Sequence, residues 1–196
     1  MRTKIGILLF DGVEELDAVG PWEVLASWAE RHPEDQVEVF TMSPGGAGVR
    51  CAKGLRVLAD RDSLAGPELD VLLYPGGRGA RALRTDPEHL DWLRALRARV
   101  PLLTSVCSGS LSFAAAGLLT GRPATSHWSC VGQLTELDPT IEPRPEERFV
   151  DTGDVITSAG VSAGIDLALH LVARLSGVEV AREVRRYIQY DPMPPV

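Results

Sequence analysis

The stretch from Thr104 to Ser110 constrains the fold of this chain more than any other. It reads Thr-Ser-Val-Cys-Ser-Gly-Ser, ends an apolar run that begins at Val100, and precedes an apolar helical pattern that continues to Leu118. A strand, a cysteine, small residues and a helix in this order are typical of a nucleophile elbow, in which a sharp turn lifts one side chain out of the sheet edge. We therefore predict that Cys107 is a nucleophile and that its backbone φ lies outside the usual negative range.

The free backbone N–H groups of the following helix should point at the Cys107 thiol and lower its pKa, so that part of it is thiolate near neutral pH. Small neighbours are needed because the turn crowds its flanks, and Ser105, Ser108 and Gly109 meet that need. Ser105 stands where the elbow pattern usually has glycine. The alternative is a small buried core cysteine, which is the commoner fate of a free thiol.

Apolar runs alternate with helical patterns along the chain. Near-continuous apolar runs predict buried strands over 4–10, 37–42, 70–74 and 100–106. Helical patterns follow Pro21, Asp86, Cys107, Ser129, Gly164 and Gly177, and shorter strands are expected over 50–59, 124–128, 149–152 and 155–158. We predict one α/β domain spanning residues 1–196, with a doubly wound, mostly parallel sheet flanked by helices on both faces, as in flavodoxin-like folds.

Two loops at the carboxyl edge of this predicted sheet carry candidate site residues. Acids at 14, 15 and 17 follow the first strand, where open α/β sheets bind ligands, although solvated loop acids are the usual alternative. A glycine-rich turn, Pro75 to Gly79, follows the strand at 70–74 and would let the backbone approach a ligand closely. It lacks the GxxxxGK[ST] pattern of a phosphate loop.

Composition excludes several classes of function. The net charge of −7 argues against a nucleic-acid partner, and no apolar run approaches a membrane span. Three widely spaced cysteines and four scattered histidines predict neither a disulfide framework nor a metal site. With no signal-peptide pattern at the start, we expect a cytoplasmic protein.

Together these residues resemble the ThiJ/PfpI superfamily, which shares its fold with class I glutamine amidotransferases. The resemblance covers essentially the whole chain. Its marks are the acid loop after the first strand, Tyr74-Pro75-Gly76-Gly77, Val106-Cys107-Ser108-Gly109 and Thr157-Ser158-Ala159-Gly160. The chain is most similar to the isocyanide hydratase branch, in the stretches 12–21, 117–122, 124–128 and 160–166.

This chain departs from the family pattern because it lacks the histidine that partners the cysteine in several relatives. PfpI-type proteases have a histidine directly after the cysteine, where this chain has Ser108, and deglycase-like relatives have one in a later loop, where 131–150 contains none. His127 matches a structural histidine of the family. A Cys–His triad is therefore disfavoured, and protease and amidotransferase activities with it.

The resemblance implies a site made of Cys107 and a carboxylate. In the hydratase branch an aspartate lies beside the cysteine, and Asp17 matches it; Glu15 is the alternative acid. By the same resemblance, the backbone N–H groups of Gly77 and Ser108 stabilise developing charge. The same family pattern places Gly160 and Val161 in the pocket lining, with Trp128 as an apolar wall.

These residues predict the hydration of an isocyanide to an N-substituted formamide through a Cys107 thioimidate, with a small-molecule substrate and no cofactor. Relatives mostly form homodimers through the face near the first helix, and we expect the same here. Three alternatives stay open: a glyoxalase or deglycase, a redox sensor whose cysteine oxidises to sulfinic acid, and a ligand-binding domain like those of AraC-type regulators. The sequence contains no basic DNA-binding segment, which weakens the last.

Overall fold

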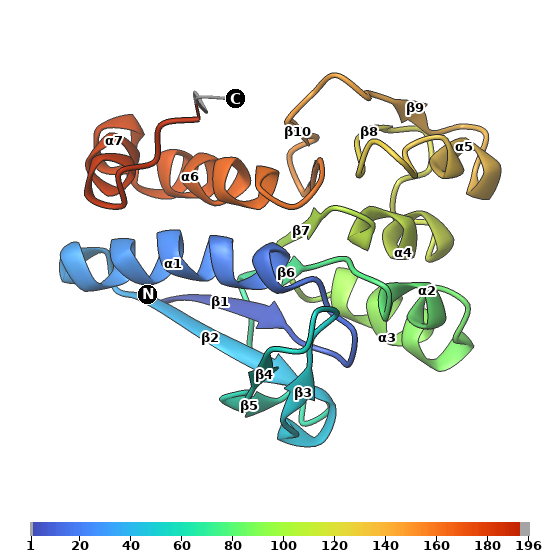
Figure 1. Cartoon of the computed structure of the whole chain (residues 1–196), viewed down its shortest axis with the longest axis horizontal. Helices are drawn as coiled ribbons and strands as arrows, with labels where there is room; N and C mark the ends of the chain where they lie inside the picture. The colour runs from blue at the N-terminus through green and yellow to red at the C-terminus, as the bar shows by residue number, and fades with distance from the viewer. Residues whose placement is uncertain (1, 193–196) are drawn as a thin grey trace.

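A seven-stranded sheet forms the centre of the computed structural model, which describes residues 2–192 (Figure 1). The strand order is β10-β11-β7-β6-β1-β2-β5, and all neighbours are parallel except β10 and β11. The predicted mostly parallel sheet is confirmed. The bounds are β1 Thr3–Leu8, β2 Val37–Ser43, β5 Arg61–Asp62, β6 Val71–Tyr74, β7 Leu102–Val106, β10 Phe149–Asp151 and β11 Val155–Ser158.

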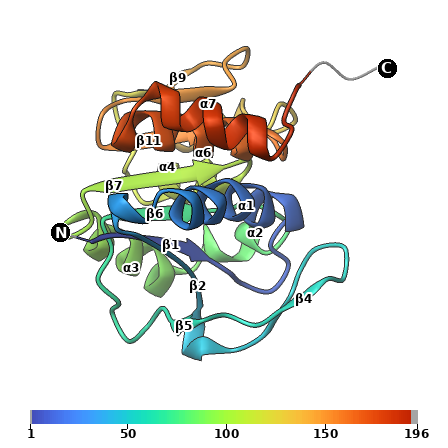
Figure 2. The same cartoon turned by 90° about the vertical axis from the view of Figure 1, so that its left-hand side faces the viewer.

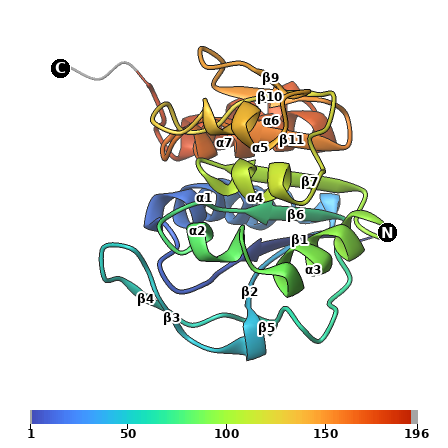
Figure 3. The same cartoon turned by 90° about the vertical axis from the view of Figure 1, so that its right-hand side faces the viewer.

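Helices cover both faces of this sheet. Figure 2 shows α1 and α7 in front of the strands, and the opposite view in Figure 3 shows α2, α3 and α4 in front. Among residues 2–192, every helix is too short or too polar to span a membrane. The bounds are α1 Glu15–Arg31, α2 Ala80–Leu83, α3 Pro87–Arg97, α4 Gly109–Ala115, α5 Gln133–Leu137, α6 Ala163–Ser176 and α7 Val178–Tyr187, with short 3-10 turns at Pro33–Asp35 and Pro44–Gly46.

Two short ribbons stand outside the main sheet. One pairs β3 (Val49–Arg50) with β4 (Arg56–Val57) in antiparallel fashion, as expected for 50–59. The other pairs β8 (Pro123–Ala124) with β9 (Glu142–Pro143), so the strand expected over 124–128 is much shorter, and the following helix begins at Gln133.

The first helix begins six residues earlier than expected. α1 starts at Glu15, and Pro21 lies inside it rather than at its start. The φ of proline is compatible with a helix, and acids in the first turn are favoured by the partial positive charge of the helix N-terminus. The consequence is that Asp17 lies on the first turn of a helix and not in a flexible loop.

The parallel register brings four chain segments to one edge of the sheet. β1, β6, β7 and β11 are neighbours and run in the same direction, so their carboxyl ends lie side by side. The residues that follow them include the acid loop, Gly76, Cys107 and Ala159. The predicted crevice residues therefore meet at the edge where open α/β sheets bind ligands.

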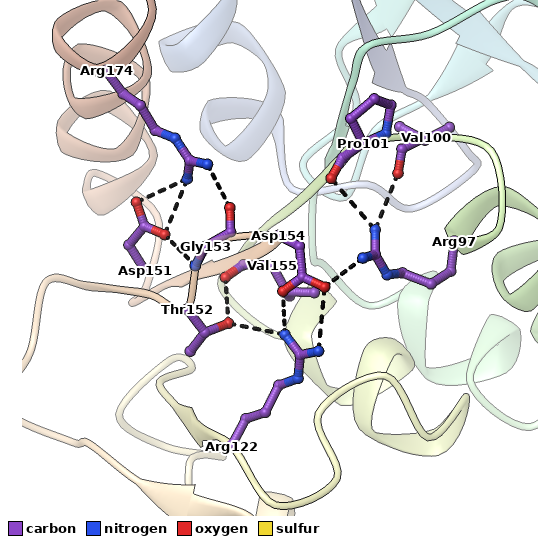
Figure 4. A network of polar contacts seen from close by, with 10 residues as sticks. All are labelled: Arg97, Val100, Pro101, Arg122, Asp151, Thr152, Gly153, Asp154, Val155 and Arg174. Carbon is purple, nitrogen blue, oxygen red and sulfur yellow. Dashed lines mark hydrogen bonds and ion pairs between the residues drawn. The ribbon is translucent and has the colours of Figure 1, made fainter.

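The opposite edge of the sheet is held by an ion cluster (Figure 4). Asp154, in the turn before β11, forms ion pairs with Arg97 and Arg122, and the hydrogen bond from Arg122 is the main reason for its lowered pKa. In the neighbouring strand, Asp151 accepts hydrogen bonds of 3.0 and 3.1 Å from Arg174 of α6. These contacts tie β10 and β11 to α3 and α6, and β11 in turn carries carbonyls that hold Cys107.

The expected homodimer has a candidate surface beside α1. Val19 of α1 is 44% exposed and Leu58 is 82% exposed, and both line one hollow together with Trp22. Exposed apolar side chains gathered in one place are typical of protein interfaces.

We predict that sedimentation equilibrium at micromolar concentration gives twice the 21.2 kDa chain mass, and that Leu58→Asp shifts the equilibrium to monomer. A wild-type monomer under these conditions would contradict the prediction.

Candidate functional site

Cys107 occupies a strained turn between β7 and α4. Its φ is +59°, in the left-handed region, as predicted from the sequence. Its N–H donates to the carbonyls of Ser158 (3.2 Å) and Ala159 (3.1 Å). Its carbonyl accepts hydrogen bonds from the hydroxyls of Ser110 (3.2 Å) and Ser126 (3.0 Å). A left-handed conformation costs a non-glycine residue on the order of 1–3 kcal/mol, and these four hydrogen bonds hold it in place.

Two backbone N–H groups, from Ser108 and Val161, interact with the Cys107 sulfur and favour its charged form. Ser108 opens the turn into α4, so its N–H is one of the free donors at the start of that helix. Val161 follows β11 and has a φ of +49°, which is a genuine outlier for a β-branched residue. A second strained residue therefore directs a backbone donor to the same sulfur atom.

Asp17 is fully buried on the first turn of α1. Its Oδ2 accepts the N–H of Gly76 at 2.9 Å, which links α1 to the turn after β6. No N–H or O–H group among residues 2–192 reaches its Oδ1. The neighbouring Cys107 thiol interacts with this carboxylate and favours its charged form. The structure thus brings Asp17 and Cys107 together, although they lie 90 positions apart in the sequence.

Burial sets the protonation of this pair. It raises the pKa of Asp17 to about 7 and is also the largest reason that the pKa of Cys107 rises to about 12, with the Asp17 charge second. The N–H groups of Ser108 and Val161 lower the Cys107 pKa but do not offset burial. The sequence-based expectation of a lowered thiol pKa is therefore wrong: near neutral pH the thiol keeps its proton while the adjacent carboxyl titrates.

Glu15, the alternative acid, faces away from Cys107. It lines the hollow beside α1 with Trp22, and its Oε1 accepts the N–H of Lys53 at 2.6 Å. Burial raises its pKa, but backbone hydrogen bonds from Glu15, Lys53 and Leu55 outweigh burial and leave the pKa below its usual value. A carboxyl held ionised in another cavity is poorly placed to exchange protons with Cys107.

Gly77 and Ser108 are joined across the site. The Gly77 N–H donates to the Ser108 hydroxyl at 3.1 Å, so it is occupied rather than directed at a reacting group. The preceding Gly76 lies so close to the start of α4 that a Cβ there would come within 2.6 Å of the Ser108 nitrogen. The glycine at position 76 therefore permits the close approach of the two turns that form the site.

A cavity of about 530 Å³ opens above Cys107. Of the residues predicted for the site, Gly77, Ser108 and Val161 line it together with Cys107. Gly160 does not, but a Cβ at that position would lie 2.2 Å from the His127 ring, so this glycine makes room for the imidazole.

Trp128, the expected apolar wall, is 80% exposed and lies outside the cavity lining. The adjacent His127 lines the cavity instead. Its Nδ1 accepts the N–H of Ser129 at 3.2 Å, which places the ring proton on Nε2. No hydrogen bond joins His127 to Cys107 within the part of the chain that is described, so the two do not form a catalytic pair.

Several residues of the cavity were not predicted from the sequence. Glu14 lines it, where a solvated loop acid was the expected alternative, and so do Cys130 and three arginines at 78, 81 and 84. The spacing of three between those arginines, which begins inside the glycine-rich turn, is the signal that could have indicated them. Among residues 2–192, no group of three or more His, Cys, Asp or Glu side chains could hold a metal ion.

Known proteins resemble this chain over its whole length. An isonitrile (isocyanide) hydratase from Pseudomonas putida is 39% identical over 100% of this chain and 82% of its own length. The crystal structure of a ThiJ/PfpI family protein from Pseudomonas syringae superposes with a TM-score of 0.89 at 35% identity, covering 100% of this chain and 78% of that one. The HTH-type transcriptional regulator GbdR from Pseudomonas aeruginosa is 28% identical over 96% of this chain, which spans only 51% of the regulator.

A family match agrees with these relatives. Residues 3–174 match the DJ-1/PfpI family, a range that includes Asp17, Cys107 and every strand of the central sheet. The predicted resemblance to ThiJ/PfpI proteins, and to the isocyanide hydratase branch within them, is confirmed. The chain belongs to the DJ-1/PfpI family.

Proposed function

We propose that this protein is an isocyanide hydratase-like lyase that adds water to an isocyanide and releases an N-substituted formamide. The observation that carries the proposal is the buried carboxyl of Asp17, whose pKa of about 7 suits proton transfer near neutral pH, beside the Cys107 thiol. The reaction needs one nucleophile and one proton carrier and requires no cofactor. Three free cysteines suit a reducing cytoplasm, where we place the reaction.

In the first step, Asp17 accepts the proton of the Cys107 thiol as the sulfur attacks the terminal isocyanide carbon. A new S–C bond forms, and Asp17 passes the proton to that carbon, which yields a thioimidate. The Ser108 and Val161 N–H groups stabilise charge on the sulfur during the transfer. Asp17 ends the step ionised, ready for a second proton.

In the second step, water adds to the thioimidate carbon. Asp17 accepts a proton from the water and passes it to the substrate nitrogen, which gives a tetrahedral intermediate and leaves Asp17 ionised. The C–S bond then breaks as the formamide carbonyl forms, and Asp17 carries the hydroxyl proton to the departing thiolate. One water is consumed, and Cys107 and Asp17 return to their starting states.

The protonation of Asp17 and Cys107 also helps to decide between the hydratase and the alternative functions. A redox sensor relies on a thiolate at neutral pH, whereas the raised pKa of Cys107 keeps it as a thiol. A glyoxalase or deglycase would use the same cysteine with an acid, but the histidine of deglycase-like relatives is missing. The hydratase needs only the neutral thiol and an adjacent proton acceptor.

The direct test is a substrate panel of an alkyl isocyanide, methylglyoxal and glutamine. We expect the wild type to convert the isocyanide to the formamide and Cys107→Ala to lose that turnover, because no nucleophile remains. Cys51→Ala is the matched control, since Cys51 is a buried cysteine outside the cavity and should leave the rate unchanged. Formamide is followed by chromatography or NMR. Turnover of methylglyoxal alone would refute the hydratase.

A second prediction concerns Asp17. Asp17→Asn keeps the size of the side chain and can still accept the Gly76 N–H, but it carries no titratable proton. Turnover should fall by about 10²–10⁴-fold, the usual contribution of a general acid or base. The melting temperature at about pH 8 should be unchanged or higher, because the amide removes the cost of burying a charge. Glu15→Gln is the control and should have a milder effect. The reverse order of the two effects would assign the acid to Glu15.

A third prediction concerns pH. Below the Asp17 pKa of about 7 the carboxyl is protonated and cannot accept the Cys107 proton, so kcat/KM should fall as pH decreases. Above it, kcat/KM should reach a plateau, because the Cys107 pKa of about 12 keeps the thiol protonated. A stopped-flow profile of kcat/KM from about pH 5 to about pH 9 tests the direction of this pH dependence. A rate that first rises above about pH 8 would instead indicate titration of an ordinary thiol.

A further inference from the structure

Three arginines form one wall of the cavity that contains Cys107. Arg78, Arg81 and Arg84 all line it. Arg81 belongs to the short helix α2 (Ala80–Leu83), Arg78 lies two residues before that helix, and Arg84 caps its C-terminal end, so the three come from one short segment of chain. We call these three residues the arginine wall.

The arginine wall has no counter-charge within the described chain. None of its members forms an ion pair with a carboxylate of residues 2–192, although many other arginines do. The one acid that lines the cavity, Glu14, is paired with Lys53. Arg84 is oriented by the side-chain oxygen of Gln133, which accepts its Nη1–H at 2.8 Å.

This arrangement contrasts with the charge of the whole chain. The protein carries a net charge of −7, yet three guanidinium groups line this cavity. A cluster of positive charge lining a cavity concentrates anions there.

We propose that the arginine wall binds an anionic group of the substrate, so that the isocyanides hydrated here carry a carboxylate or a group of similar charge and shape. This inference rests on the proposed hydratase function. A guanidinium fork matches a carboxylate in a bidentate manner, and the wall provides three. One end of the substrate is then held at the arginine wall while its isocyanide carbon reaches Cys107, and the cavity of about 530 Å³ has room for such a small molecule.

The kinetic test compares two isocyanides that differ in charge, isocyanoacetate and its methyl ester. We expect wild type to prefer the anion in kcat/KM, chiefly through a lower KM. In Arg81→Gln the ratio of anion to ester should fall by about tenfold, as expected for the loss of one charge-assisted hydrogen bond. Arg99→Gln is the matched control, because Arg99 lies at the opposite edge of the sheet, beside the Gly66 carbonyl. It should leave both substrates unchanged.

A second measurement does not depend on hydratase activity. Iodoacetate and iodoacetamide are similar in size and alkylate the same thiol, but only iodoacetate is charged. The ratio of their rates at Cys107, followed by peptide mass spectrometry, should exceed that for the uncharged thiol N-acetylcysteine amide. In Arg81→Gln and Arg84→Gln, this ratio should fall towards the ratio for the reference thiol. Added salt should lower it in the same way, because salt screens exposed charges.

The outcomes separate the two proposals. If isocyanides are hydrated but the ester is preferred and iodoacetate gains no advantage, the arginine wall is not an anion site. If neither isocyanide is hydrated while iodoacetate still reacts preferentially at Cys107, the anion site stands and the hydratase function fails. An anion preference that survives in Arg81→Gln and Arg84→Gln would overturn the assignment to these residues.

Discussion

The whole site depends on the way the Cys107 backbone is held. The carbonyls of Ser158, at the end of β11, and of Ala159 accept its N–H, and two serine hydroxyls donate to its carbonyl. A residue at φ +59° would relax without such bonds, and the thiol would then turn away from the sheet edge. Because β11 is bonded to β7 on one side and fixed by the Asp151 and Asp154 ion pairs at its other end, the sheet itself enforces the turn (Figure 4).

The chemistry of the site follows from burial. A free thiol at the start of a helix would ordinarily be a good nucleophile by itself, but enclosure and the Asp17 carboxylate keep Cys107 protonated. The same enclosure brings the Asp17 pKa to about 7, so the carboxyl can both accept and release a proton at neutral pH. The thiol therefore depends on its neighbour, which suits a reaction in which one proton must travel from sulfur to carbon.

The proposed catalytic pair and the proposed anion site come from different parts of the fold. The sheet edge and α1 supply Cys107 and the buried Asp17, while residues 78–84 supply the arginine wall. This segment is a short stretch around α2, so its side chains can vary without disturbing the buried acid–thiol pair. This separation is consistent with a family in which one fold serves enzymes and regulators alike, and in which function lies in the site rather than in the fold.

The order of strands and helices could be read from the sequence because buried parallel strands are continuous apolar runs, and the elbow at Cys107 because only small residues fit around such a turn. These patterns also placed Asp17, Gly77 and Ser108 at one edge of the sheet, and the resemblance to the family added Val161. Other features depend on distant neighbours that no local pattern contains. Burial by the surrounding sheet and helices decided the protonation of Cys107, the early start of α1 turned Glu15 away from it, and the direction of the loop after Ala124 put His127 rather than Trp128 at the cavity.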